Sequence, residues 1–364
     1  MRESYIEIDH NRLAHNLEVI KQQLKPNTQI LANLKANAYG LGAYEIGRVL
    51  EQQNIAYFSI AFINEGVFLR QKGIKTNLLV FNPSFETFDA LVDYRLEPEV
   101  SSLAYLKALS QYLKSKNLRH FPIHLKLDTG MHRAGIRPEE MDALLGQIKN
   151  NDAVSVKSVF SHLAAAEDLG EDAFTLQQIQ TFESLSKKLS EKLPEHFFRH
   201  LLNTAGIFRF PQAQYDMVRP GLGLFGYNMI TGQENTLLPI ARLKTKINQI
   251  KNLESGDTVG YNRRFKSAGN NRVGLLPLGY ADGIDRRLGY ERFYVKCRGY
   301  KIPVIGTISM DTMSVDLTHT PCQQGDEVIV FDHDQSLYDV AKQLQTIPYE
   351  IIAGLTRRLK RIVI

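Results

Sequence analysis

The chain has 364 residues, of which 43% are hydrophobic and 23% are charged, and its net charge is +5. This composition is typical of a soluble globular protein. No apolar run is long enough to cross a bilayer, and the first residues lack the apolar core of a signal peptide, so we expect a cytoplasmic protein. The basic run at residues 357–361 would suit a nucleic-acid tail, but its interleaved apolar residues favour a half-exposed strand.

In chain order, residues 3–9 alternate apolar and acidic side chains, which predicts a strand, and residues 13–24 show helical spacing of apolar residues. Apolar runs and amphipathic stretches then alternate over roughly 220 residues. The runs that predict buried strands are Ile30–Leu34, Tyr57–Phe62, Leu78–Phe81, Ile123–Leu127, Val154–Phe160 and Phe197–Leu202. The stretches that predict helices are Ala43–Leu50, Glu65–Arg70, Leu103–Leu113, Met141–Ile148 and Leu176–Leu193. A count of about eight units favours a closed (β/α)8 TIM-type barrel over an open parallel sheet.

The pattern changes near residues 230–240. From Leu243 onward, short strands separated by Gly-rich turns predict an all-β domain. We therefore predict an N-terminal strand at residues 1–10 that packs with the C-terminal domain, a barrel at residues 11–232 and a β domain at residues 233–364. The two cysteines, Cys297 and Cys322, form no CxxC pair, so we expect free thiols and no metal site.

Lys35 is the most informative residue of the chain. It is predicted to be the last residue of the strand formed by the apolar run before it, and a small, polar, glycine-bearing segment that contains Tyr39 follows. A lysine that ends a buried strand can lose its hydration, which lowers the pKa of the amine and makes it reactive. Taken alone, a surface lysine at a strand end is the commoner interpretation.

Other polar residues also follow predicted strands, where the active site of a barrel forms. These are the segments KLDTGMHRAG at residues 126–135, His162, NTAG at residues 203–206 and RPGLG at residues 219–223. Further motifs lie in the C-terminal region, namely GYN at 260–262, GYADG at 279–283, GTISMDT at 306–312 and PYE at 348–350. With the lysine segment, this ordered set resembles the alanine racemase family along the whole chain.

The resemblance implies a pyridoxal 5'-phosphate (PLP) enzyme in which Lys35 binds the cofactor covalently and acts as a base on one face of the substrate. Tyr261 is implied as the base on the opposite face, since racemisation removes a proton from one side and returns one from the other. Arg219 matches the arginine that faces the pyridine nitrogen, with His162 supporting it. Because a guanidinium remains protonated, it is a poor proton donor to that nitrogen, which disfavours transamination.

The resemblance also assigns the remaining contacts. The cofactor positions are Tyr39, Asn203, Thr204, Gly221, Leu222 and Tyr349, and the substrate positions are Arg133, Met310, Asp311 and Tyr280. Arg286 matches a residue of the outer entrance. Lys126 matches a lysine that is N-carbamylated in many members, and an unmodified lysine is the alternative. Glu167, Thr307 and Ser309 depart from common family residues, which leaves the shape of the entrance and the breadth of substrates open.

The resemblance further implies a head-to-tail homodimer, in which the β domain of one subunit completes the site of the other, acting on L- and D-alanine for peptidoglycan. The alternatives are a broad-specificity or serine racemase, a fold-related decarboxylase and a non-catalytic PLP-binding protein. Decarboxylases of this fold pair the pyridine nitrogen with a carboxylate, so Arg219 argues against them. The non-catalytic PLP proteins lack a β domain, so residues 233–364 argue against that class.

Overall fold

The computed structural model describes residues 4–193, 195–230, 236–332 and 337–364. The chain forms two compact units. The barrel unit comprises residues 14–36 and 46–237, and the sheet unit comprises residues 1–13, 37–45 and 238–364. The predicted domain boundary between residues 232 and 233 lies outside the described residues.

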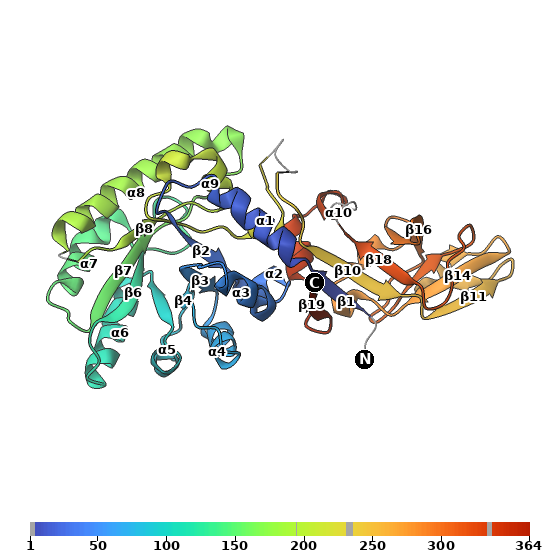
Figure 1. Ribbon diagram of the computed structural model, residues 1–364, viewed down its shortest axis with the longest axis horizontal. Helices are drawn as coiled ribbons and strands as arrows, with labels where there is room; N and C mark the ends of the chain where they lie inside the picture. Colours follow the sequence, from blue (N-terminus) through green and yellow to red (C-terminus); the bar gives the residue numbers. More distant parts are fainter. Residues whose placement is uncertain (1–3, 194, 231–235, 333–336) are drawn as a thin grey trace. The chain divides into compact units, whose positions relative to one another are not determined.

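The barrel unit contains a closed barrel of parallel strands in sequence order, which confirms the predicted (β/α)8 class (Figure 1). Its strands are β2 (Gln29–Asn33), β3 (Tyr57–Ile60), β4 (Asn77–Val80), β5 (Glu97–Val100), β6 (Phe121–Lys126), β7 (Val154–Phe160), β8 (Phe198–His200) and β9 (Met217–Val218). The helices along this part of the chain are α1 (His10–Lys21), α2 (Lys35–Tyr39), α3 (Ala43–Glu51), α4 (Ile63–Gln71), α5 (Phe88–Asp93), α6 (Leu103–Ser115), α7 (Met141–Ile148), α8 (Asp172–Lys192) and α9 (Thr204–Arg209).

Burial on both faces explains why the barrel strands read as continuous apolar runs rather than alternating ones. All four residues of β3 are buried, for example. Leu31, Tyr57, Leu79 and Met217, from four different strands, form one buried cluster inside the unit. The pairing of β9 with β2, Gln29 opposite Met217, closes the barrel.

The sheet unit is built on nine strands in the order β11-β14-β17-β16-β15-β18-β10-β1-β19. The members are β1 (Tyr5–Ile8), β10 (Ala241–Lys246), β11 (Gln249–Leu253), β14 (Asn271–Leu276), β15 (Tyr294–Cys297), β16 (Tyr300–Ile305), β17 (Met313–Asp316), β18 (Glu327–Phe331) and β19 (Lys360–Val363). A separate pair joins β12 (Thr258–Val259) to β13 (Phe265–Lys266). The N-terminal strand β1 lies between β10, to which it is antiparallel, and β19, to which it is parallel.

The structure corrects two of the expectations drawn from the sequence. The C-terminal region is rich in sheet but not all-β, because it carries α10 (Leu337–Leu344) and α11 (Pro348–Ala353). Strand β2 ends at Asn33, so Lys35 follows the strand by two residues instead of ending it. Among the described helices, none has the length and apolar character needed to span a membrane.

Candidate active site

Lys35 lies at the carboxyl edge of the barrel, held by the strand end before it. The Asn33 side chain donates to the carbonyls of Arg219 and Pro220, both at 3.2 Å, and accepts from Ser59 Oγ at 2.6 Å. Burial lowers the pKa of the Lys35 amine, and the nearby cations Arg133 and Lys126 lower it further. The amine therefore deprotonates more easily than an ordinary lysine.

The backbone after Lys35 is left-handed. The φ angles of Ala36, Asn37, Ala38 and Tyr39 all lie between 51° and 55°. For L-residues this conformation costs roughly 1–2 kcal/mol per residue. A run of four such residues is therefore strained, and it persists only where other contacts hold it.

Glu65, in the first turn of α4, supplies one of those contacts. Its Oε1 accepts from the Ala36 amide at 2.6 Å, and its Oε2 accepts from the amides of Ala61 at 2.6 Å and Phe62 at 3.1 Å. The same carboxylate raises the pKa of Lys35, against the effect of burial. Glu65 thus fixes the start of the left-handed turn, and its negative charge favours the protonated form of the Lys35 amine.

The end of the left-handed turn belongs to the sheet unit. The Tyr39 and Tyr349 ring centroids lie 5.7 Å apart, and burial raises the pKa of the Tyr39 hydroxyl, which stays protonated. A Cβ on Gly40 would lie 2.0 Å from the Ile352 carbonyl oxygen, so only glycine fits there. Arg361 donates to the Gly40 carbonyl through Nε at 3.0 Å and through Nη2 at 2.5 Å.

Arg219, which follows β9, is 3% exposed and is surrounded by acceptors. Its Nη2 donates to the carbonyls of Ser161 at 2.5 Å and Leu201 at 2.9 Å, and lies 3.3 Å from His162 Nδ1. Its Nη1 lies 2.8 Å from His200 Nδ1. The sequence predicted His162 as the supporting residue, and the structure adds His200 as the closer histidine.

A chain of hydrogen bonds continues from His200 into the barrel. Its Nε2 lies 2.7 Å from Ser158 Oγ, and Ser158 Oγ lies 2.7 Å from His124 Nδ1. The chain ends where His124 Nε2 lies 2.8 Å from Glu97 Oε2. Because a guanidinium can only donate, His200 accepts at Nδ1 and donates from Nε2 to Ser158 Oγ, whose own proton can continue the same direction through His124 to Glu97.

The pKa shifts agree with that direction. Burial and the Arg219 charge lower the pKa of His200 and of His162 well below the usual value, so both rings are neutral acceptors at Nδ1. Burial lowers the pKa of Arg219 to about 9, which still leaves the guanidinium protonated at neutral pH. The arrangement therefore holds a fixed positive charge against two neutral imidazoles.

Backbone amides gather around Thr204 at the same edge. The amides of Gly221 and Gly223 donate to Thr204 Oγ1 at 3.2 and 3.3 Å. Leu222 begins a short 3-10 turn, and Asn203 caps α9 by accepting from the Gly206 amide at 2.9 Å. These amides hold the Thr204 hydroxyl oxygen, so its own O–H can donate to an anionic group such as a phosphate.

Lys126, the last residue of β6, contacts Glu99 of β5. Its Nζ lies 3.2 Å and 3.3 Å from the two carboxylate oxygens. Arg133 is exposed on a loop closed by the bridge between Leu127 and Ile136. The charge of Arg133 lowers the pKa of Lys35, Lys126 and Glu99, so the loop directs that guanidinium towards the same edge.

The sheet unit carries the remaining predicted residues on its surface. Tyr261 is 68% exposed, Met310 54% and Tyr280 42%. The amides of Tyr280 and Ala281 donate to the carbonyls of Ser309 and Met310, each at 3.0 Å, which joins two of the predicted motifs. Arg358 Nη2 donates to Asp311 Oδ1 at 2.6 Å.

The cofactor implied by the resemblance can be tested against this chain's own groups. Among the described residues, the hydrogen bonds of Arg219 use Nη1 and Nη2, so the Nε–H donor is left for an acceptor such as a pyridine nitrogen. The lowered pKa of Lys35 suits an amine that binds an aldehyde. With the Thr204 hydroxyl as a donor for the phosphate, these residues fit PLP.

The structure brings most of the predicted residues into two groups. The barrel unit holds Lys35, Lys126, Arg133, His162, Asn203, Thr204, Arg219, Gly221 and Leu222. The sheet unit holds Tyr39, Tyr261, Tyr280, Met310, Asp311 and Tyr349. The sequence did not single out His200, Glu99 or Glu65. The alternation of Glu97 and Glu99 around one residue is the signal that could have indicated two carboxylates on the same face of a strand.

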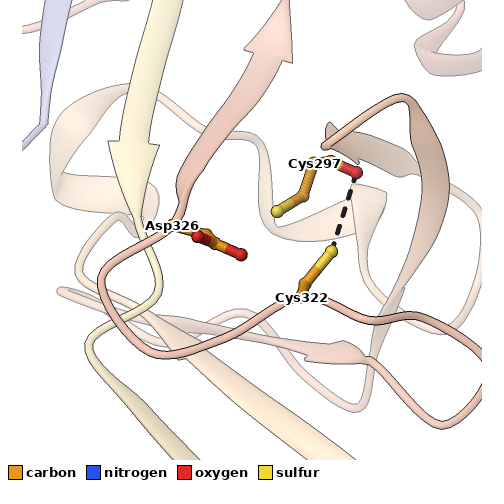
Figure 2. A group of neighbouring side chains, drawn as sticks. All are labelled: Cys297, Cys322 and Asp326. Carbon is orange, nitrogen blue, oxygen red and sulfur yellow. Dashed lines mark hydrogen bonds between the residues drawn. The ribbon is translucent and has the colours of Figure 1, made fainter.

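The two cysteines lie together in the sheet unit. Ligand atoms of Cys297, Cys322 and Asp326 are all within 4.8 Å of one another (Figure 2). Burial raises the pKa of the Cys297 thiol, whereas metal binding needs a thiolate. Asp326 already accepts from the Gln323 amide at 2.8 Å. We therefore interpret the two cysteines as buried thiols, and Asp326 as a carboxylate that stabilises the adjoining turn.

Comparisons with known proteins agree over the whole length. Residues 8–229 match the family described as alanine racemase, N-terminal domain, and residues 240–363 match alanine racemase, C-terminal domain. The chain is 33% identical over 369 residues to the alanine racemase of Clostridium kluyveri, covering 98% of this chain and 93% of that protein. It is 34% identical over 360 residues to the serine/alanine racemase of Enterococcus gallinarum, covering 97% of this chain but 50% of that longer protein. The solved structure of alanine racemase from Clostridium difficile 630 has a TM-score of 0.93 and 29% identity to this chain, with 100% of this chain and 96% of that chain covered.

Proposed function

This chain belongs to the alanine racemase family of PLP-dependent isomerases, and from that premise we propose that it interconverts L-alanine and D-alanine with PLP as its cofactor. The observation that carries the proposal is the pair formed by Lys35 and Arg219 at one edge of the barrel. One is an amine with a lowered pKa, and the other is a buried guanidinium that, within the described part of the chain, hydrogen-bonds through Nη1 and Nη2 and not through Nε.

PLP, when bound, withdraws electrons from the substrate's α-carbon and so makes its hydrogen acidic. Lys35 would hold the cofactor and then take or return the α-proton at its Nζ on one face. Tyr261 would do the same at its hydroxyl oxygen on the other face. Two bases of this kind allow both directions of racemisation, because one removes the proton from its own face and the other then delivers a proton to the opposite face.

Arg219 would limit the reaction to racemisation. Its protonated guanidinium, held by His200 and two carbonyls, offers a hydrogen bond at Nε but does not give up its proton. Electron withdrawal by the cofactor is then moderate, which disfavours protonation away from the α-carbon. A carboxylate at this position would favour other PLP reactions, and for that reason we prefer a racemase to a decarboxylase.

The remaining predicted residues would bind and orient. Tyr39, Asn203, Thr204, Gly221, Leu222 and Tyr349 would hold the cofactor phosphate and its surroundings. Arg133 and the Met310 amide would bind the substrate carboxylate, with Asp311 beside them, and Tyr280 would narrow the entrance. The side chains of Tyr261, Tyr280 and Met310 are exposed, so they would be accessible to a partner subunit that covers them.

We therefore also propose a homodimer in which the sheet unit of one subunit completes the barrel site of the other. The product D-alanine would serve peptidoglycan synthesis in the cytoplasm. A serine racemase activity is the second candidate, favoured by the similarity to the Enterococcus gallinarum serine/alanine racemase. A pocket separates a methyl from a hydroxymethyl group by only about 1–3 kcal/mol, so both activities are compatible with one site.

The test uses purified protein loaded with PLP. We expect the wild-type protein to show an absorbance band at about 420 nm. The Lys35→Ala variant should lack this band. A D-amino-acid oxidase assay run in parallel with L-alanine, L-serine and L-lysine should then show the highest turnover with L-alanine. A dimer that carries PLP but does not turn over L-alanine would contradict the proposal and favour a non-catalytic PLP-binding protein.

A further inference from the structure

Glu99 is a buried carboxylate for which the proposed reaction has no use. It is the third residue of β5, lies opposite His124 of β6 in the barrel register and is 1% exposed. A carboxylate in such a place is costly unless a partner compensates its charge. Its partner is Lys126, whose Nζ faces both oxygens at 3.2 and 3.3 Å.

The charges around this pair are mainly positive. Lys126, Arg133 and Arg219 all stabilise the charged form of Glu99. Lys126 and Arg219 also face the same aromatic ring, since Nζ of the lysine lies 5.8 Å and Cζ of the arginine 5.3 Å from the Phe160 centroid. Glu99 is therefore the carboxylate that compensates this cluster of cations from within the barrel.

We infer that Glu99 is a positioning residue that keeps Lys126 as an unmodified ammonium ion bound to its carboxylate. This replaces the carbamate that family resemblance predicts for Lys126. Carbamylation would need the neutral amine to attack carbon dioxide, forming an N–C bond while one C=O π pair moves to oxygen and one N–H proton is released. The product would be a second anion beside the buried carboxylate of Glu99, with the ammonium partner lost.

The pair has a consequence for the neighbouring arginines. A lysine and a glutamate that neutralise each other leave Arg133 and Arg219 as the cations available to anionic or basic ligand atoms. Without the carboxylate, Lys126 would add a third uncompensated positive charge. The effect of this pair on catalysis rests on the proposed function, whereas the chemical state of Lys126 does not. An experiment can therefore contradict one of these two claims and leave the other standing.

The experiment is carbon-13 NMR of the PLP-loaded protein in 13C-labelled bicarbonate. A lysine carbamate gives a carbonyl resonance distinct from bicarbonate, and Lys126→Ala assigns it. We expect no such resonance in the wild type or in Glu97→Gln, a matched control that removes a carboxylate two residues away on the same strand. We expect one in Glu99→Gln, where the amide leaves no anion to hold the ammonium ion.

A Lys126-dependent resonance in the wild type would overturn the inference, and so would its absence from a folded Glu99→Gln protein. If Glu99→Gln does not fold, Glu99→Ser and the wild-type spectrum decide by the same criteria. A second readout compares the effects of two Glu99 variants on kcat and on KM. Glu99→Asp, which keeps the charge, should restore the wild-type pattern more fully than Glu99→Gln, and equal effects of the two variants would contradict a role for the charge.

Discussion

Nη1 of Arg219 lies 2.8 Å from Nδ1 of His200, and this bond sets the direction of a buried hydrogen-bond chain that ends at Glu97. The chain passes through Ser158 and His124, with each step between 2.7 and 2.8 Å. Since the guanidinium supplies protons to its neighbours without accepting any, His200 must be neutral. The position of the Arg219 guanidinium thus depends on a histidine that the sequence does not single out.

We predict that His200→Ala destabilises the protein by about 1–3 kcal/mol, because a buried N–H of Arg219 loses its acceptor. Racemase activity should fall as well, since the guanidinium loses one of the contacts that orient it. His196→Ala is the control, because that ring is exposed and lies near the same strand. Urea unfolding at fixed PLP concentration measures the difference, and equal losses in the two variants would contradict a specific role for His200.

The lowered pKa of Lys35 should appear in its chemical reactivity. In protein freed of PLP, the rate of acetylation of Lys35 should reach half its maximum at a lower pH than that of an exposed lysine. Glu65→Gln should move this midpoint lower still, because the carboxylate favours the charged amine. Glu86→Gln, at an exposed position, should leave it unchanged. A midpoint that rises in Glu65→Gln would show that the sign of the Glu65 effect is wrong.

The left-handed conformation of Ala36 predicts that a glycine at this position does not destabilise the protein. Ala36 is exposed with a φ of 52°, so Ala36→Gly removes the steric cost of this conformation without loss of buried surface. That gain of roughly 1–2 kcal/mol exceeds the backbone entropy cost of glycine, about 0.5–1 kcal/mol, so stability should stay equal or rise. Ala108→Gly, in the middle of α6, should destabilise by about 1 kcal/mol. Thermal unfolding of both variants checks the contrast, and a loss at Ala36 as large as at Ala108 would contradict it.

The barrel strands that are apolar could be predicted from the sequence. Strands β5 and β9 could not, because β5 carries charged residues and β9 is very short. Strand β5 carries Glu97, which is half-buried, and Pro98 and Glu99, which are buried. The two acids are accommodated because they pair with His124 and Lys126. A sequence pattern does not show those partners. Strand β9 has only two residues, Met217 and Val218, too few for any periodicity.

The site shows the same division. Lys35 and Arg219 could be predicted because they lie in motifs near strand ends. The left-handed turn could not, because Ala36, Asn37, Ala38 and Tyr39 have no glycine among them and adopt it under the control of contacts such as that of Glu65. Helices α10 and α11 were missed because they are short and follow a long run of strand and turn signals.

The central claim is that Lys35 and Tyr261 act together across two subunits, and mixing two inactive variants tests it most directly. Lys35→Ala and Tyr261→Ala proteins, each inactive, are mixed, and mass spectrometry of the intact dimers confirms subunit exchange. Hybrid dimers should contain one intact site, so a statistical mixture should regain about a quarter of wild-type alanine racemase activity. No recovery in a mixture that contains hybrid dimers would contradict shared sites and the pairing of these two residues across the interface.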